Sequence, residues 1–366
     1  MTDGSLMGVK YRVAFETLRR EILLGKFDAH EKFPSEGQLC RRFSMSRNTV
    51  RLALAELKKA GILETRKGAG TFLSAFARNA TGYLGLILPD YGSGEIFTEI
   101  GAGISIAAAE EGYSLLFGNT SGANPDVRAM QALRLAYDYA ARHVAGVILE
   151  PVELTPDNDR ITRMILDIFS AKNIPVVLID RDFMPPPERS AYDLVGIENA
   201  QAAYEIAHYL ISRGARELRF FVRPNSAYTT RLRFQGVMVA AIEAGLSWRR
   251  SCEVVADPAD SMAVGAMFAH RHRADAVICA NDATAVELVR TINKLGLSVP
   301  EDVMVTGFDD VRFASLLTPA LTTMRQPCEL IAQTAVQTLL QRVRSPSLPA
   351  RTISLQTKLV VRASTR

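Results

Sequence analysis

Four consecutive side chains, Ser46-Arg47-Asn48-Thr49, carry hydrogen-bonding groups suited to duplex DNA, and Arg51 follows shortly after them. Arginine pairs with guanine through two hydrogen bonds and asparagine pairs with adenine in the same way, while serine and threonine hydroxyls suit phosphate oxygens. These residues are a candidate for base-specific contact with DNA. The alternative is a capped surface helix that happens to carry arginines.

A second set of polar residues follows apolar segments later in the chain. Asp180 and Arg181 follow IPVVLI, Asn281 follows DAVICA, and Asp309 follows DVMVTGF. Arg233 begins a helical segment after ELRFFVR. Such acceptors and forked donors suit a polyol or sugar better than an apolar ligand. The alternative role is local: the two aspartates cap the next turn, and the asparagine makes an Asx-turn.

Two predicted helices precede Ser46. Apolar residues at positions 11, 15, 18 and 22 recur at helical spacing, and Gly25 ends that run. The segment Ser35-Glu36-Gly37-Gln38 has the S-x-x-Q form of a capping box, which predicts a second helix reaching about Phe43. A brief turn at Ser44-Met45 leads to Ser46, which caps a third helix. Together these elements predict a helix-turn-helix.

The third predicted helix has an apolar face made by Val50, Leu54 and Leu57, and Gly61 ends it. The stretch RKGAGTFL follows, between predicted strands at 62–66 and 71–73. A phosphate-binding loop for a nucleotide requires a buried strand before its glycines and a helix after them. Because a short strand follows instead, we interpret RKGAGTFL as a basic hairpin whose Phe72 anchors the return strand in the core.

The basic charge is concentrated in this first part of the chain. The 366 residues carry a net charge of +4, but residues 1–80 hold 15 Lys and Arg against 8 Asp and Glu, whereas the remainder holds 28 against 31. A basic head on a slightly acidic body favours an anionic polymer as the partner of the head.

From Tyr83 onward, short apolar runs alternate with helical stretches, and the rhythm restarts after DLVGIEN. This βαβ pattern predicts an α/β fold with two doubly wound lobes of parallel strands. Ligands of such sheets bind at the carboxyl ends of the strands, and here we expect the ligand between the lobes.

Several classes of protein are excluded. No apolar run approaches the roughly 20 residues that span a bilayer, and the start lacks the apolar core of a signal peptide, so we expect a cytoplasmic protein with no membrane partner. His270 and His272 lack a neighbouring Cys or acidic cluster, so no metal site is expected. No nucleotide-loop, nucleophile-elbow or H-E-x-x-H motif occurs, so we expect no enzyme, no catalytic residue and no cofactor.

The stretch KFPSEGQLCRRFSMSRNTVRLALAELKKAGILETRKGAGTFL resembles the winged helix-turn-helix of the GntR family of bacterial repressors almost end to end. The resemblance implies that the third helix contacts operator DNA and that Lys67-Gly68 enters the minor groove. Gly37 stands where family members often carry a DNA-contacting arginine, and Arg41 or Arg42 is a candidate to replace that contact. The expected DNA-binding residues are Ser35, Arg41, Ser46, Arg47, Asn48, Thr49, Arg51, Arg66, Lys67 and Gly68.

Segments such as VAGVILEPVE, IPVVLIDRD and CANDATAVELVRTINKLGLSVPEDVMVTGFDD resemble the effector-binding part of the LacI/GalR family, whose fold is that of periplasmic sugar-binding proteins. The resemblance covers nearly all of 83–366, and the combination of parts resembles arabinose-responsive repressors. Phe97 has plain core packing as its alternative role, and Glu150 replaces a residue that is often Asn. The implied effector-binding residues are Phe97, Glu150, Asp180, Arg181, Arg233, Asn281, Asp309 and Gln326.

We therefore expect a winged helix-turn-helix at 1–73, a linker at 74–82 and a two-lobed periplasmic-binding-protein-like domain at 83–366. The expected function is repression of a carbohydrate-utilisation operon by a homodimer on a palindromic operator, controlled by a small sugar-like effector bound between the lobes. The competing interpretation is a solute-binding protein that binds sugars without binding DNA. The basic head and the absence of a signal peptide argue against it.

Overall fold

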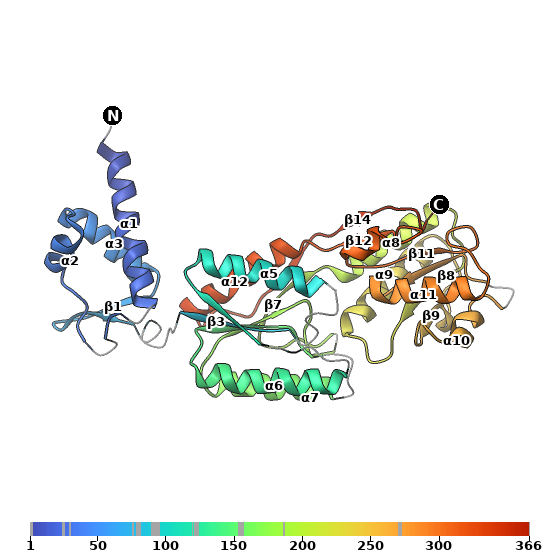
Figure 1. Cartoon of the computed structure of the whole chain (residues 1–366), viewed down its shortest axis with the longest axis horizontal. Coiled ribbons are helices and arrows are strands. Elements are labelled where there is room, and N and C mark those ends of the chain that lie inside the picture. The colour runs from blue at the N-terminus through green and yellow to red at the C-terminus, as the bar shows by residue number, and fades with distance from the viewer. Residues whose placement is uncertain are drawn as a thin grey trace.

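The structure is a computed structural model of the chain. It describes residues 3–23, 26–28, 31–74, 77, 82–88, 96–118, 120, 124–152, 157–185, 187–269 and 273–365. Gly25, His270, His272 and most of the expected linker 74–82 lie outside the described residues. Figure 1 shows three parts in a row: a small helical head, a lobe built on a six-stranded sheet, and a lobe built on a four-stranded sheet.

The head contains three helices followed by an antiparallel hairpin. Its elements are α1 (Asp3–Leu23), α2 (Glu36–Phe43), α3 (Arg47–Lys59), β1 (Leu63–Arg66) and β2 (Gly70–Leu73). Ser35 and Gln38 form the predicted capping box, and the Oγ of Ser46 accepts from the N–H of Thr49 at 3.3 Å. Gly61, at φ 71°, follows α3, so the three helix boundaries expected from local signals are confirmed.

The core of the head lies between α1, α3 and the hairpin. Val50, Leu54 and Leu57 are buried there, as the apolar face of α3 predicts. The prediction for Phe72 is wrong, because Leu73 is the residue of β2 that enters this core. The pairing register explains it: buried Leu63 lies opposite Leu73, which places Phe72 on the other face of the hairpin, opposite Glu64.

The six-stranded sheet is entirely parallel, in the order β13-β7-β6-β5-β3-β4. Helices α5 and α12 cover one face and α6 and α7 the other (Figure 1). The elements are β3 (Tyr83–Ile87), α5 (Ile96–Glu110), β4 (Ser114–Phe117), α6 (Pro125–Ala141), β5 (Gly146–Leu149), α7 (Asn158–Ser170), β6 (Val176–Ile179), β7 (Asp193–Ile197), α12 (Cys328–Arg344) and β13 (Thr352–Leu355).

The second lobe has a parallel sheet in the order β11-β10-β8-β9. Helices α8 and α9 pack together beside this sheet, and α11 packs on β10 and β11. The elements are α8 (Asn199–Ser212), β8 (Leu218–Val222), α9 (Tyr228–Glu243), β9 (Glu253–Val255), α10 (Ser261–Ala266), β10 (Ala276–Cys279), α11 (Asp282–Lys294) and β11 (Met304–Thr306), with 3₁₀ turns at Arg250–Cys252 and Arg312–Ser315.

The chain crosses between the lobes more often than the alternating pattern predicts. After β11, a strand β12 (Thr323–Arg325) leads to α12, which lies in the six-stranded lobe, and β13 extends the sheet of that lobe. The chain then returns to pair β14 (Lys358–Val360) with β12. The α/β class with two doubly wound lobes is confirmed, while each lobe is completed by distant segments. None of the described helices combines the length and apolar character needed to span a bilayer.

Candidate DNA-binding surface and candidate effector site

The exposed side of α3 carries most of the residues expected to contact bases. Arg47, Asn48 and Arg51 are all exposed. Thr49 differs from its prediction, since only 4% of it is exposed and its hydroxyl lies 2.8 Å from the Oγ of Ser46. Thr49 and Ser46 therefore bond to each other and stabilise the start of the helix.

Two of the predicted arginines already have carboxylate partners on the same surface. Arg51 lies 3.6 Å from Glu36 of α2, and Arg66 lies 2.8 Å from Glu64. The Arg66 guanidinium also lies over the Phe72 ring, 4.7 Å from its centroid. These contacts hold the guanidinium groups near the surface, and a phosphate must compete with the carboxylates for them.

The hairpin tip has the backbone geometry that its glycines were expected to allow. Gly68 and Gly70 have φ values of 79° and 120°, which favour glycine. Exposed Lys67 lies at this tip. A Cβ atom at Gly70 would lie 2.2 Å from Cε of Lys32, so the Lys32 side chain crosses the hairpin there. Lys32 adds a positive charge that the sequence patterns did not single out.

Helix α2 supplies the remaining predicted contacts. Ser35 caps it from an exposed position, and Arg41 is exposed. Arg42 is paired with Glu21 of α1 at 2.5 Å and lies over the Phe43 ring. Of the two arginines considered as substitutes at the Gly37 position, Arg41 is therefore the better placed to reach DNA.

In the six-stranded lobe, Arg181 gathers two of the predicted acids. Its Nη2 donates to Oε1 of Glu150 at 2.7 Å and its Nη1 to Oδ2 of Asp180 at 2.9 Å. Glu150 follows β5 and Asp180 follows the neighbouring β6, so both lie at the same edge of the parallel sheet. All three side chains are at most 8% exposed.

In the four-stranded lobe, Arg233 is held by the protein through several groups. Its Nε donates to Oδ1 of Asn199 at 2.8 Å, and its Nη1 donates to the carbonyl of Ala280 at 2.6 Å. The guanidinium lies 3.6 Å from the ring centroid of Phe308. Arg233 is in the second turn of α9 rather than at its start. Asn199 was missed, although its place directly after a strand is the same signal that singled out Asn281.

Asp309 and Gln326 meet after β11 and β12. The Gln326 amide donates to Oδ1 of Asp309 at 2.7 Å. Burial is the main cause that raises the pKa of Asp309 to about 8. The charge of Arg233 and the hydrogen bond from Gln326 lower this pKa, and the carboxylates of Asp282 and Asp180 raise it. Asp180 and Arg233, from opposite lobes, thus both influence Asp309. We call Glu150, Asp180, Arg181, Arg233, Asp309 and Gln326 the interlobe cluster.

Two predicted residues have local structural roles. Oδ1 of Asn281 accepts from the N–H of Thr284 at 2.9 Å and caps α11, which is the Asx role named as its alternative. Phe97 is 4% exposed and belongs to the apolar core shared by α5 and α12. The structure therefore does not place these two among the charged groups of the interlobe cluster.

A direct hydrogen bond joins the two lobes. The Tyr228 hydroxyl, at the start of α9, donates to Oδ2 of Asp159 in the first turn of α7 at 3.0 Å. Burial and the Asp159 carboxylate raise the pKa of Tyr228, so the phenol stays protonated as the donor at neutral pH. The bond was missed because neither residue belongs to a recognisable sequence pattern.

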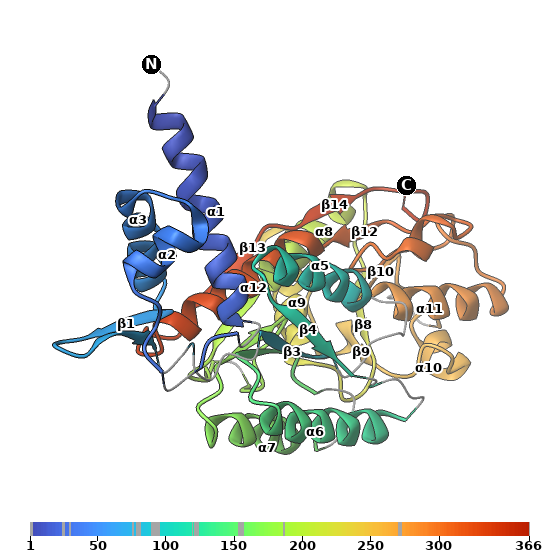
Figure 2. The same cartoon turned by 60° about the vertical axis from the view of Figure 1, so that its left-hand side comes forward.

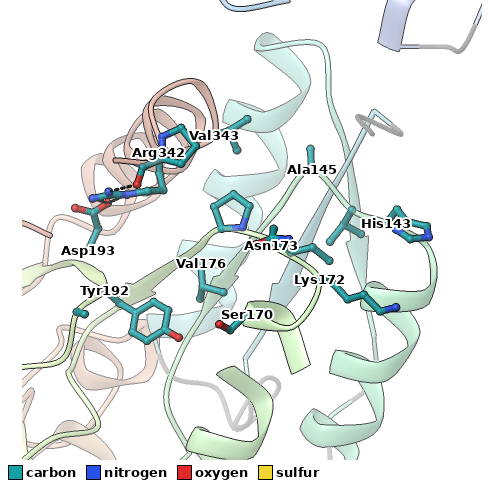
Figure 3. Close-up of a pocket in the computed structure, with 15 residues that line it drawn as sticks. His143, Ala145, Ser170, Lys172, Asn173, Val176, Tyr192, Asp193, Arg342 and Val343 are labelled. Carbon is teal, nitrogen blue, oxygen red and sulfur yellow. Dashed lines mark hydrogen bonds and ion pairs between the residues drawn. The ribbon is translucent and has the colours of Figure 1, made fainter. Parts of the chain in front are cut away.

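A cavity of about 530 Å³ lies at the opposite end of the six-stranded sheet (Figure 3). Its wall includes Val176 and Asp193, the first residues of β6 and β7, whereas the interlobe cluster follows the carboxyl ends of the strands. Arg342 in this wall donates to Asp193 at 2.9 Å and to the carbonyl of Pro346 at 3.1 Å. The cavity is therefore separate from the candidate effector site, and its Arg342–Asp193 ion pair is satisfied by the protein.

The head contacts the six-stranded lobe through α1 (Figure 2). Nη2 of Arg19, a residue only 9% exposed, donates to Oε2 of Glu111 at 2.9 Å and also to the Glu111 carbonyl. Arg344, the last residue of α12, lies 3.8 Å from the same carboxylate. Glu111 directly follows α5, so α5 and α12 both end at the head.

A basic winged helix joined to a two-lobed domain with a polar cluster between its lobes defines a ligand-controlled DNA-binding regulator. Residues 10–73 match the family described as bacterial regulatory proteins, gntR family, and residues 207–365 match the periplasmic binding protein-like domain.

Known proteins agree with this class. The arabinose metabolism transcriptional repressor of Geobacillus stearothermophilus is 27% identical, over 98% of both chains. The HTH-type transcriptional repressor PurR of Yersinia enterocolitica is 30% identical, over 85% of this chain and 89% of its own. A solved complex of the transcriptional regulator CelR with cellobiose shares the fold over 94% of this chain and 99% of its own, with a TM-score of 0.65 at 22% identity.

The chain belongs to the LacI family of bacterial transcriptional repressors, and its DNA-binding part is of the gntR family. These relatives are repressors rather than enzymes.

Proposed function

We propose that this repressor controls genes for the use of a carbohydrate, and that a small sugar binds at the interlobe cluster. The proposal is carried by the Tyr228–Asp159 hydrogen bond of 3.0 Å, which brings the two lobes together where Asp180 of one lobe is near enough for its charge to act on Asp309 of the other. A ligand that contacts both lobes binds their two arrangements with different affinity, which is the requirement for control. The relation to a repressor of arabinose metabolism supports a sugar as that ligand.

The cluster favours a neutral sugar or polyol over a sugar acid or a phosphorylated sugar. Arg181 is paired with two carboxylates, and Arg233 is bonded to Asn199 and a backbone carbonyl. Asp309 adds a third acidic side chain, which is buried and holds its proton at neutral pH because its pKa is raised to about 8. An anionic ligand would have to displace these partners, whereas sugar hydroxyls donate to carboxylate oxygens directly.

Each of the three segments of the chain has its own proposed role. Residues 1–73 bind the operator, residues 74–82 connect, and residues 83–366 bind the effector and hold two copies together as a cytoplasmic homodimer. A twofold-symmetric pair of heads reads a palindromic operator. Arg47, Asn48 and Arg51 on α3 contact bases, while Lys67 and Gly68 approach the phosphates.

A screen of neutral sugars, sugar acids and sugar phosphates by thermal shift tests the proposed ligand class. We expect stabilisation by a neutral pentose or hexose, and a much smaller shift for Asp309→Ala. The same sugar should change the affinity of the protein for a duplex selected from a random library. Equal stabilisation of both proteins would remove Asp309 from the site. An unchanged DNA affinity with sugar bound would contradict the proposed control.

A further inference from the structure

One apolar side chain interrupts the polar side of α3. Leu52 is 44% exposed, between Arg51 and buried Ala53. Residues three, four and seven positions apart share one face of a helix, so Leu52 lies on the strip that also carries Asn48, Arg51 and exposed Ala55. Leu52 and Ala55 therefore form an apolar part of the surface that faces outward beside the base-contacting candidates.

Leu52 is not used by the core of the head. The core is formed on the other side of α3 by Val50, Leu54 and Leu57. Single exposed apolar residues are common on protein surfaces and usually need no explanation. Leu52 differs from such residues because it lies on the face of α3 that is proposed to enter a DNA groove. In that groove Leu52 would be removed from water together with Asn48 and Arg51.

Base edges in the major groove offer one apolar group, the 5-methyl group of thymine. We infer that Leu52, with Ala55 one turn further on, reads a thymine methyl next to the base pair contacted by Asn48 or Arg51. This inference rests on the proposed placement of α3 in the major groove. In this role Leu52 helps the protein to distinguish thymine from other bases. A search for hydrogen-bonding side chains does not find such a residue, because leucine has no polar side-chain group.

The proposed contact can be removed from either side, by replacing thymine with uracil in the DNA or by replacing Leu52 with alanine in the protein. The probe is the duplex that the wild-type protein selects most strongly from a random library, with each thymine replaced in turn by uracil. We expect uracil at one or two positions in each half-site to weaken wild-type binding about fourfold, the factor that corresponds to burying one methyl group. Leu52→Ala should bind the thymine duplex about as weakly as the wild type binds the uracil duplex. Uracil at those positions should not weaken the binding of Leu52→Ala further. Fluorescence anisotropy at one salt concentration measures both.

Two comparisons complete the experiment. Val13→Ala truncates an exposed apolar residue of α1 and should keep the wild-type response to uracil. Leu52→Met preserves an apolar side chain and should also respond, which separates contact from helix stability. If Leu52→Ala keeps the full response at every thymine, the inference is overturned. If Arg47→Ala also leaves DNA binding unchanged, the failure belongs instead to the proposed placement of α3.

Discussion

Arg47 differs from its neighbours in the described part of the head, where Glu36 and Glu64 hold Arg51 and Arg66 while no carboxylate pairs with Arg47. We expect Arg47→Ala to weaken binding to the selected duplex by about 1–3 kcal/mol and to relax the preference at one base position. Competition binding against single-base variants measures both effects. Arg213→Ala, on an exposed turn of the four-stranded lobe, is the matched control. Unchanged preference at every base would show that Arg47 contacts none.

Asp309 makes stability depend on pH in a defined direction. Its pKa is raised to about 8 from an ordinary value of 3.8, so the folded protein holds this proton more tightly than the unfolded chain does. The resulting stabilisation is full below about pH 4, and it is lost progressively as the pH rises from there through about 8. Asp309→Asn cannot ionise, yet its amide oxygen can still accept from Gln326. We expect the variant to gain about 1–3 kcal/mol over the wild type between pH 5 and pH 8.

Thermal unfolding at pH 5, 6.5 and 8 tests this expectation for Asp309. The control is Asp157→Asn, because the Asp157 side chain is 59% exposed and bonded only to Arg160 among the described residues. Stability curves for Asp309→Asn and the wild type that stay parallel across the pH range would show that Asp309 is ionised in the folded protein.

Helix α2 is the element in which this chain departs from the GntR pattern. A Cβ atom at Gly37 would meet nothing within 4 Å, so a larger side chain fits there. We expect Gly37→Arg to stabilise the head by about 0.5–1 kcal/mol through its better helix propensity, and to strengthen DNA binding through one more phosphate contact. Gly37→Ala should also stabilise the head, but it adds no phosphate contact and should leave DNA binding unchanged.

Salt titration separates the two effects at Gly37. Gly37→Arg should make the log–log salt dependence of DNA binding steeper by about one for each bound head, whereas Gly37→Ala should leave it unchanged. Identical slopes for both variants would mean that position 37 does not face a phosphate.

The elements that local chemistry specifies were predictable from sequence. The helix caps at Ser35 and Ser46 and the end of α3 at Gly61 depend on residues within one or two turns, and each is present as expected. The choice between Phe72 and Leu73 depends on the register of two very short strands, where a shift of one residue exchanges the faces. A four-residue strand carries too little alternation to decide it.

The candidate site divides in the same way. Asp180 and Arg181, which follow a parallel strand, could be located because the carboxyl ends of such strands meet at one edge, whereas Glu150 was expected only from the family resemblance. The partners Asn199 and Tyr228 depend on how α8 and α9 pack and on how the lobes face each other. These distances arise from the tertiary arrangement, and single-sequence patterns contain no record of them.

At the scale of the whole molecule, the junction at Glu111 is placed to connect the two functions. Helices α5 and α12 begin on the side of the interlobe cluster, where α12 follows Gln326 closely, and end at Arg19 of the head. A Cβ atom at Gly103 of α5 would lie 2.7 Å from Cβ of Ala332 of α12, so the two helices pack closely. We therefore expect α5 and α12 to move as one unit and to shift the Glu111 contact with the head when the lobes move.

We expect Arg19→Glu to leave sugar binding intact and to reduce the effect of the sugar on DNA affinity at least about threefold, within the usual range of coupling energies. Adding Glu111→Arg should restore part of that effect, because the exchanged charges attract again. The measurement is DNA affinity with and without saturating sugar, and thermal unfolding confirms that each variant is folded. No recovery in the double variant, or full coupling in Arg19→Glu, would exclude this contact as the connection.

The contact between Arg19 and Glu111 also bears on whether the head can be exchanged for another DNA-binding module. Helix α12 has 17 residues and so extends about 25 Å, which keeps the proposed effector site at its start far from the head contact at its end. If that contact is the connection, we expect an unrelated DNA-binding module that offers a guanidinium to Glu111 to respond to the effector as well. We therefore expect a chimera built on residues 83–366 to acquire a new operator while it keeps the same effector.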